Sequence, residues 1–177
     1  MEACDLFVVI ITVTVLTLLS SSPVLPKFSL ASLTVTKLNN STGDRSFSCL
    51  DMQFQVLNPN LVTDTFYNDV YCSVYHGKHR LASTASPLPG FFQRAGETTQ
   101  INVTINLMPG AIASGVRNDL ATYGVAHFDV KLTAVIKWRF RSPVSVGVSC
   151  QDVVVGLLPA SGGNSKIIGP ARMCRVS

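Results

Sequence analysis

Strict alternation between apolar and polar residues is the strongest structural signal in this 177-residue chain. The clearest case runs from His127 to Phe140, where every second side chain from Phe128 onward is apolar. Successive side chains of a strand point to opposite faces of a sheet, so this period is typical of a strand with one buried and one solvated face. The same period recurs over residues 48–56, 70–74, 101–107 and 144–155. We therefore expect an all-β fold.

The number of expected strands and the short segments between them favour one architecture. Shorter apolar segments near residues 30–35 and 80–82 bring the total to about six to eight strands, a typical number for a sandwich. No helical pattern alternates with the strands, so an antiparallel arrangement in two stacked sheets is expected. The sequence thus predicts an antiparallel β-sandwich of the immunoglobulin or fibronectin type III kind.

One segment departs from the alternation and predicts a short helix. Ile112, Val116 and Leu120 lie four residues apart, and Gly124 follows where a helix C-cap would lie. We expect this helix at the edge of the sandwich.

The N-terminal segment is apolar and carries no charge from Leu6 to Leu25. About 20 apolar residues cross the hydrocarbon layer of a bilayer as a helix. We therefore expect a transmembrane signal-anchor helix over residues 1–25 that contacts membrane lipid through residues 6–25. A cleaved signal peptide is the competing interpretation, but Glu2 and Asp5 stand where a signal peptide carries basic residues.

The orientation of this anchor is left open by the sequence. Lys27 follows the apolar run and acidic residues precede it, which by the positive-inside rule would keep the domain in the cytosol. N-glycosylation sequons at Asn40 and Asn102 favour the opposite orientation. Asn102 lies on the polar face of its expected strand, where a sugar would project into water.

The cysteines and the C-terminal residues give weaker signals. None of the cysteines has the spacing of a zinc site. Buried free thiols are the favoured interpretation, and a disulfide in an exported domain is the alternative. Residues 159–177 are rich in Gly, Ser and Pro, so we expect a flexible tail after a domain that spans residues 26–158. The cysteines are Cys4, Cys49, Cys72, Cys150 and Cys174.

The sequence contains no recognisable catalytic or cofactor-binding signature. A GxSxG nucleophile motif, an EF-hand loop and a phosphate-binding Gly-rich loop are all missing. The histidines His76, His79 and His127 are expected at the surface rather than in a metal site. The net charge of +4 is modest and dispersed, which argues against a nucleic-acid-binding protein. We expect no enzyme activity, no metal and no cofactor.

Four basic residues are expected to share the solvent face of the longest strand. A basic row of this kind suits anionic lipid headgroups or acidic cell-wall polysaccharide. The competing interpretation is a solvated face that discourages edge-to-edge pairing of strands. The residues are Lys131, Lys137, Arg139 and Arg141.

Several turn signals separate the expected strands. Asn58-Pro59-Asn60 should end a strand, because Pro59 lacks a backbone donor and asparagine side chains bond to nearby backbone groups. Gly77 is expected in a turn between two strands.

A second corner is expected at Pro89-Gly90, where the proline and glycine interrupt regular structure. Phe91 and Phe92 follow this corner and are expected to cover the open end of the core.

Taken in order, these turn and motif residues resemble the sequence pattern of the plant NHL family, the non-race-specific disease resistance and hairpin-induced-like proteins. The domain of that family is the late embryogenesis abundant group 2 β-sandwich, and the resemblance covers roughly residues 26–158. The matching points are Pro26-Lys27-Phe28, Asn58-Pro59-Asn60, Phe66-Tyr67, Tyr75-His76-Gly77, Leu88-Pro89-Gly90-Phe91-Phe92-Gln93, Gly124 and Val148-Ser149-Cys150.

The resemblance implies a single-pass plasma-membrane glycoprotein with its sandwich outside the cell. It implies action through interactions in the hypersensitive defence response and in stress tolerance, with a protein or a cell-wall polysaccharide as partner and no catalysis. Members of the family usually carry a longer cytosolic tail before the helix, whereas only Met1 to Asp5 precede it here.

Two other functions stay open from the sequence. The chain could act as a general protectant of membranes or proteins under stress, as the late embryogenesis abundant domain suggests. It could also be a secreted carbohydrate-binding or hydrolytic protein released by signal cleavage, although no paired catalytic carboxylates are recognisable.

Overall fold

The computed structural model describes residues 2–20, 22–39, 45–107, 111–139, 141–157, 165–167 and 169–177. The two helices in these residues are α1 (Glu2–Ser20) and α2 (Ala111–Tyr123). The strands are β1 (Lys27–Asn39), β2 (Arg45–Leu57), β3 (Thr65–His76), β4 (His79–Ser83), β5 (Phe91–Gln93), β6 (Thr98–Asn106), β7 (Val125–Trp138), β8 (Val144–Leu157), β9 (Ser165–Ile167), β10 (Arg172–Met173) and β11 (Arg175–Val176).

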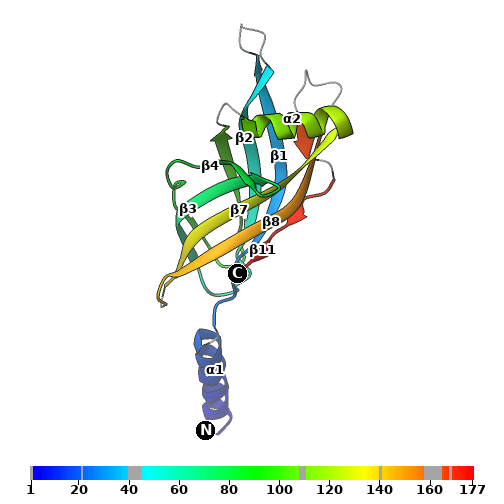
Figure 1. Ribbon diagram of the computed structural model, residues 1–177. Coiled ribbons are helices and arrows are strands. Elements are labelled where there is room, and N and C mark those ends of the chain that lie inside the picture. Colours follow the sequence, from blue (N-terminus) through cyan, green and yellow to red (C-terminus); the bar gives the residue numbers. More distant parts are fainter. Residues whose placement is uncertain are drawn as a thin grey trace.

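The strands pair in an antiparallel manner and fold over into two layers. The order along the sheet is β4-β3-β7-β8-β9-β1-β2-β6, with β5 beside β3, β10 beside β1 and β11 beside β8. Figure 1 shows β3, β7 and β8 crossing over β1 and β2 at a steep angle. The prediction of an antiparallel all-β fold with one short helix in the domain is confirmed.

The expected immunoglobulin or fibronectin type III form of the sandwich is not confirmed. Strand β9 pairs with β8 on one side and with β1 on the other, so the two layers belong to one continuous sheet. An immunoglobulin-type sandwich has two separate sheets. The linking strand has only three residues, too few for an alternating pattern to reveal it in the sequence.

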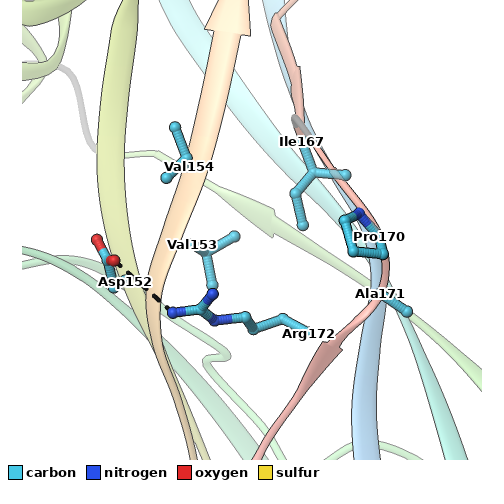
Figure 2. Close-up of a pocket in the computed structure, with 7 residues that line it drawn as sticks. All are labelled: Asp152, Val153, Val154, Ile167, Pro170, Ala171 and Arg172. Carbon is cyan, nitrogen blue, oxygen red and sulfur yellow. Dashed lines mark ion pairs between the residues drawn. The ribbon is translucent and has the colours of Figure 1, made fainter.

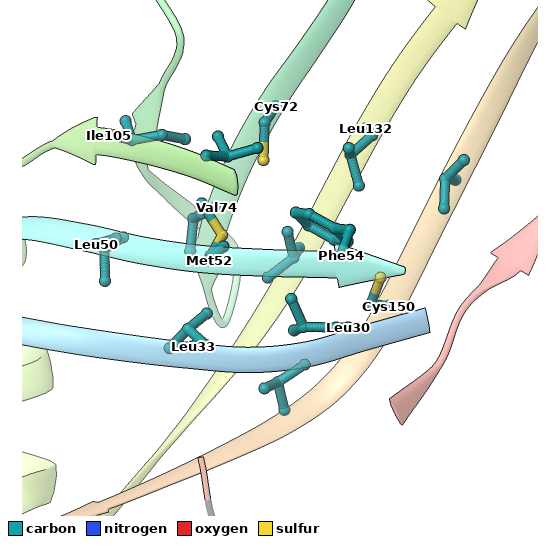
Figure 3. Packing of buried hydrophobic residues seen from close by; sticks show 14 of the residues in the cluster. Leu30, Leu33, Leu50, Met52, Phe54, Cys72, Val74, Ile105, Leu132 and Cys150 are labelled. Carbon is teal, nitrogen blue, oxygen red and sulfur yellow. The ribbon is translucent and has the colours of Figure 1, made fainter. Parts of the chain in front are cut away.

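Alternating apolar side chains from both layers form the core. Along β7 every second side chain from Ala126 to Trp138 is buried, and the intervening ones are exposed or half-buried. Figure 3 shows side chains of β1 and β2 meeting those of β3 and β7. The buried residues labelled there are Leu30, Leu33, Leu50, Met52, Phe54, Cys72, Val74, Ile105, Leu132 and Cys150.

Helix α2 covers the end of the sandwich opposite α1 (Figure 1) and confirms the predicted helix. Val116 and Leu120 are buried against the core. The backbone N–H of Gly124 donates to the Leu120 carbonyl at 3.2 Å, and Gly124 has the left-handed φ of +72° that a helix C-cap requires. His76 Nε2 at the end of β3 lies 2.8 Å from Asp119 Oδ2, which ties the helix to the sheet.

The hairpin between β3 and β4 has the turn that the sequence predicts. Gly77 and Lys78 connect the strands, and Gly77 has a φ of +57°. Glycine adopts this conformation without strain because it has no Cβ.

Strands β9, β10 and β11 are part of the sheet, which corrects the prediction of a flexible tail over residues 159–177 for the described part of that segment; residues 159–164 and 168 lie outside the described residues. In its described part, β9 and β10 pair with β1, and β11 pairs with β8. The Gly-, Ser- and Pro-rich composition did not reveal these strands, because backbone hydrogen bonding between strands does not need apolar side chains.

A disulfide joins this segment to the core. Cys174 is bonded to the buried Cys150, so the prediction of free thiols is wrong for this pair. Cys49 and the buried Cys72 are free cysteines. The partner of Cys150 lies 24 residues away in the sequence, and only the pairing of β10 and β11 places it alongside β8.

Helix α1 lies apart from the sandwich, and residues 22–26 connect it to β1 without regular structure (Figure 1). Among the residues that the structure describes, no helix combines the length and the apolar character needed to cross a membrane. The transmembrane anchor expected over residues 1–25 is therefore not confirmed and stays a prediction.

Replacing Cys174 with serine should lower the free energy of unfolding by about 3 kcal/mol, because the disulfide closes a long loop in the unfolded chain. Chemical denaturation of the full chain with and without reductant measures this effect. Reductant should destabilise the parent chain to the level of the variant and leave the variant unchanged. Equal stabilities of the two chains under oxidising conditions would contradict the assignment of this disulfide.

Candidate functional site

Asn58 and Asn60 form a buried polar corner at the end of the sandwich from which α1 leaves. Both side chains are buried. Asn58 Nδ2 donates to the carbonyls of Thr63 at 2.9 Å and Arg94 at 3.0 Å, and its Oδ1 accepts from Asn60 Nδ2 at 2.8 Å. Strand β2 ends at Leu57, so the predicted strand end is confirmed. The corner also fastens the loop before β3 to the turn after β5, which the sequence did not reveal.

The Asn60 carboxamide holds the segment that follows α1. The backbone N–H of Val24 donates to Asn60 Oδ1 at 2.7 Å, and Asn60 Nδ2 donates to the Val24 carbonyl at 2.9 Å. The backbone N–H of Gly96 donates a hydrogen bond to the backbone carbonyl of Asn60 at 2.9 Å. Val24 lies four residues beyond the end of α1 at Ser20, so Asn60 fixes where the helix leaves the domain.

Gln93 supports the same end from inside the core. Its Nε2 donates to the Val56 carbonyl at 2.6 Å, and its Oε1 accepts from the Tyr67 hydroxyl at 2.7 Å. Burial raises the pKa of Tyr67, so its phenol stays neutral and serves as a donor. Phe91 stacks on Tyr67 with ring centroids 4.1 Å apart. The expectation that Phe91 covers the core is confirmed.

The corner at Pro89 and Gly90 brings the chain close to β3. The backbone N–H of Leu88 donates to the Val70 carbonyl at 2.8 Å. A Cβ on Gly90 would lie 2.8 Å from the carbonyl oxygen of Tyr67, so only glycine fits.

Phe66 and Phe92 lie on the outer surface of this end. Their rings are 4.9 Å apart, and the side chains are 41% and 43% exposed. The expectation that Phe92 covers the core is therefore wrong, because side chains alternate along β5 and Phe91 and Gln93 take the inner positions. Lys137 lies directly across the β3–β7 ladder from Phe66 and is exposed.

The structure divides the predicted basic row. Lys131 and Lys137 share the exposed face of β7, but they are six residues and therefore about 20 Å apart. The Lys131 ammonium lies 4.9 Å from the centroid of the Tyr75 ring, away from the other three residues. Arg139 and Arg141 follow the end of β7 at Trp138 and are both exposed. Three of the four residues thus gather at the end where Phe66 lies.

The candidate glycosylation sites differ in what the structure describes. Asn102 is exposed on the outer face of β6, where its Oδ1 accepts from Gln53 Nε2 at 3.3 Å. The surface there is a wide, open hollow that also involves Thr104, whose hydroxyl donates to Asp51 Oδ1 at 2.7 Å. Asn40 lies outside the described residues. Attachment of sugar stays a prediction.

A small pocket of about 150 Å³ lies between β8 and the C-terminal segment (Figure 2). Asp152 on its wall lies 2.6 Å from His127 Nδ1 and 3.7 Å from the Arg172 guanidinium. The hydrogen bond from His127 lowers the pKa of Asp152, and the charges of His127 and Arg172 act in the same direction. All three side chains are exposed. This arrangement is a surface ion pair that joins the C-terminal segment to β8.

The free cysteine Cys72 lies in the buried core. Burial raises the pKa of Cys72 to about 12, so its thiol is not a nucleophile. Within the described ranges, no group of three or more His, Cys, Asp and Glu side chains could hold a metal ion.

Residues 53–152 match the model of a protein family described as late embryogenesis abundant protein. This match covers more than half of the chain. The chain belongs to the late embryogenesis abundant protein family. It is therefore a stress-related protein of the late embryogenesis abundant type, and the matched residues include the Asn58–Asn60 corner and Cys150.

Other comparisons add little to this assignment. No curated protein matches the chain. Among solved structures, it is similar to the crystal structure of a protein from Archaeoglobus fulgidus, with 8% sequence identity over 73% of this chain and 97% of that chain. The TM-score of 0.39 is too low to support an argument from that likeness.

Asn60→Ala should loosen the junction between α1 and the late embryogenesis abundant domain. The substitution removes both hydrogen bonds to Val24 and one to Asn58, which should cost about 2 kcal/mol of unfolding free energy. The hydrogen-exchange rate of the Val24 backbone amide should be higher in the variant. Asn106→Ala, at an exposed position of β6, is the matched control and should change neither quantity. Unchanged exchange at Val24 in Asn60→Ala would contradict the proposed fastening.

Asp152→Asn should reduce the loss of stability in acid. The folded-state pKa of Asp152 is depressed, so its contribution is present above the unfolded pKa of about 4 and is lost as the pH falls through the folded value. Thermal unfolding from neutral to acidic pH should therefore show a shallower decline in the variant. Asparagine tolerates the φ of +54° at this position, and Asp69→Asn, where φ is +49°, is the control for backbone conformation. An unchanged acid decline in Asp152→Asn would contradict the prediction.

Proposed function

We propose that this chain is a membrane-anchored, non-enzymatic interaction protein of the NHL type, acting in plant defence and stress tolerance. Membership of the late embryogenesis abundant family is the observation that carries the proposal. In this proposal α1 is the anchor, and the sandwich lies on the outer side of the plasma membrane as a partner-binding domain.

The surface of α1 supports its role as the anchor. Its described large apolar side chains are 46–65% exposed, and they are Leu6, Phe7, Val8, Val9, Ile10, Ile11, Val13 and Val15. A continuous apolar surface of this kind is costly in water and favourable in lipid.

The threonines of α1 also suit a lipid environment. Thr12 and Thr14 donate their hydroxyls to the carbonyls of Val8 and Ile10, each at 2.8 Å. The helix therefore satisfies these polar groups internally, as a helix in lipid must.

The disulfide supports an exported sandwich. Bonds such as Cys150–Cys174 form and persist in oxidising compartments and are rare in the cytosol. The exposure of Asn102 is compatible with the same orientation. In this proposal these observations take precedence over the charge distribution around the helix, with acidic residues before it and Lys27 after it, which favours the opposite orientation.

A general protective role for membranes or proteins under stress is the second candidate. The family match supports this role as directly as it supports interaction with a specific partner. Plants that lack the protein distinguish the two roles. Loss of a general protectant should lower survival under drought, whereas loss of a defence interaction protein should lower resistance under pathogen challenge.

Fractionation of plant cells that express the full chain tests anchoring and orientation together. The protein should stay in the membrane pellet after alkaline carbonate washing. The sandwich should be cleaved by added protease in sealed right-side-out plasma-membrane vesicles and should resist protease in sealed inside-out vesicles. Asn102→Gln should reduce a glycosidase-sensitive mass shift, and Asn40→Gln combined with Asn102→Gln should abolish it. Release of the protein by carbonate, or protection of the sandwich from protease in right-side-out vesicles, would contradict the proposal.

A further inference from the structure

We infer that the end of the sandwich next to α1 is a docking surface for anionic phospholipid headgroups, which holds the domain against the bilayer. We call it the docking end, and it consists of Leu61, Val62, Phe66, Phe92, Lys137 and Arg141. The inference rests on the proposed function, because it requires α1 to be embedded in lipid.

The apolar part of the docking end projects from the rigid corner. Leu61 and Val62 directly follow Asn60 and are 86% and 57% exposed. The hydrogen bond from Asn58 to the Thr63 carbonyl holds the loop in place, so little further ordering is needed when it enters an interface. One exposed leucine is ordinary, but an aliphatic pair beside exposed aromatic residues is a patch that calls for a partner.

Strand register places the aromatic and basic residues beside this loop. Phe66 is the second residue of β3, and it pairs with Phe92 on one side and with Lys137 on the other. Thr65 at the start of β3 pairs with Trp138, and the backbone N–H of Arg141 donates to the Trp138 carbonyl at 3.3 Å. Aromatic rings and basic side chains at the same level suit the headgroup region of a bilayer.

Lysine and arginine at this level complement anionic headgroups. Each basic residue near an anionic membrane surface strengthens binding by about fivefold. Lys137 and Arg141 are exposed and lie at the docking end, whereas Lys131 lies about 20 Å further along β7.

The tether identifies the bilayer as the occupant. Asn60 fastens Val24 to the domain, and the four residue-to-residue steps from Ser20 to Val24 span at most about 14 Å. A lipid-embedded α1 therefore keeps the docking end within reach of the headgroup layer. Figure 1 shows α1 next to this end of the sandwich. Such a short tether gives the bilayer a high effective concentration, and it leaves little room for a protein or polysaccharide between them.

Hydrogen exchange on the full-length protein tests this inference directly. The chain is reconstituted into nanodiscs of phosphatidylcholine alone or of phosphatidylcholine with phosphatidylglycerol. Amides of the loop 61–64 should exchange about tenfold more slowly in the anionic discs, and high salt should reverse part of this difference. This comparison needs no variant, so it does not depend on the folding of a mutant.

Two double variants test which residues cause the slower exchange in anionic discs. Leu61→Asp with Val62→Asp, and Lys137→Glu with Arg141→Glu, should each abolish the lipid-dependent protection. Tyr123→Asp on the exposed opposite end and Lys131→Glu further along β7 are the matched controls and should retain it. Thermal unfolding in detergent identifies any variant that does not fold.

The outcomes separate this inference from the proposed function. Equal exchange in neutral and anionic discs, with the chain still resistant to carbonate, would overturn the docking surface and leave the anchor intact. Protection that requires added pectin would assign the basic residues to polysaccharide and also overturn it. Loss of the chain from the discs would contradict the proposed function itself.

Discussion

Burial of one face of every long strand between two layers is the constraint on which the rest of this protein depends. The alternation that places Phe54 in the core also places Gln53 and Gln55 outside, and the same rule orients every residue of β7. Because the layers pack through these side chains, the connections at each end are forced into defined positions. The functional surfaces are built from those connections and from the outward-facing residues.

The Asn58–Asn60 corner connects the packed core to the segment that follows α1. Buried amide groups must find hydrogen-bond partners, and here the partners come from three separate segments: the loop after β2, the turn after β5, and the irregular segment after α1. The corner therefore transmits the position of the rigid core to Val24. In a chain anchored by α1, this link sets the orientation of the sandwich relative to the bilayer.

The candidate site was only partly predictable from the sequence. Asn58-Pro59-Asn60 was recognisable as a strand end, but its role in holding Val24 depends on a contact across 36 positions. The basic row was recognisable from the period of β7, yet the strand ends at Trp138 and leaves Arg139 and Arg141 in the following turn. Phe92 could have been assigned to the outer face if the three-residue strand β5 had been recognised, since Phe91 then points inward.

The sequence by itself determined the antiparallel all-β class, the short helix before Gly124, the hairpin at Gly77 and the faces of the long strands. These properties follow from periodicity and local backbone preferences, which act between near neighbours. Only the tertiary structure decided the continuous sheet through β9, the Cys150–Cys174 bond and the gathering of apolar and basic residues at one end. Each of these joins segments far apart in the chain, and their pairing is selected by the packing of the whole domain, which no local pattern encodes.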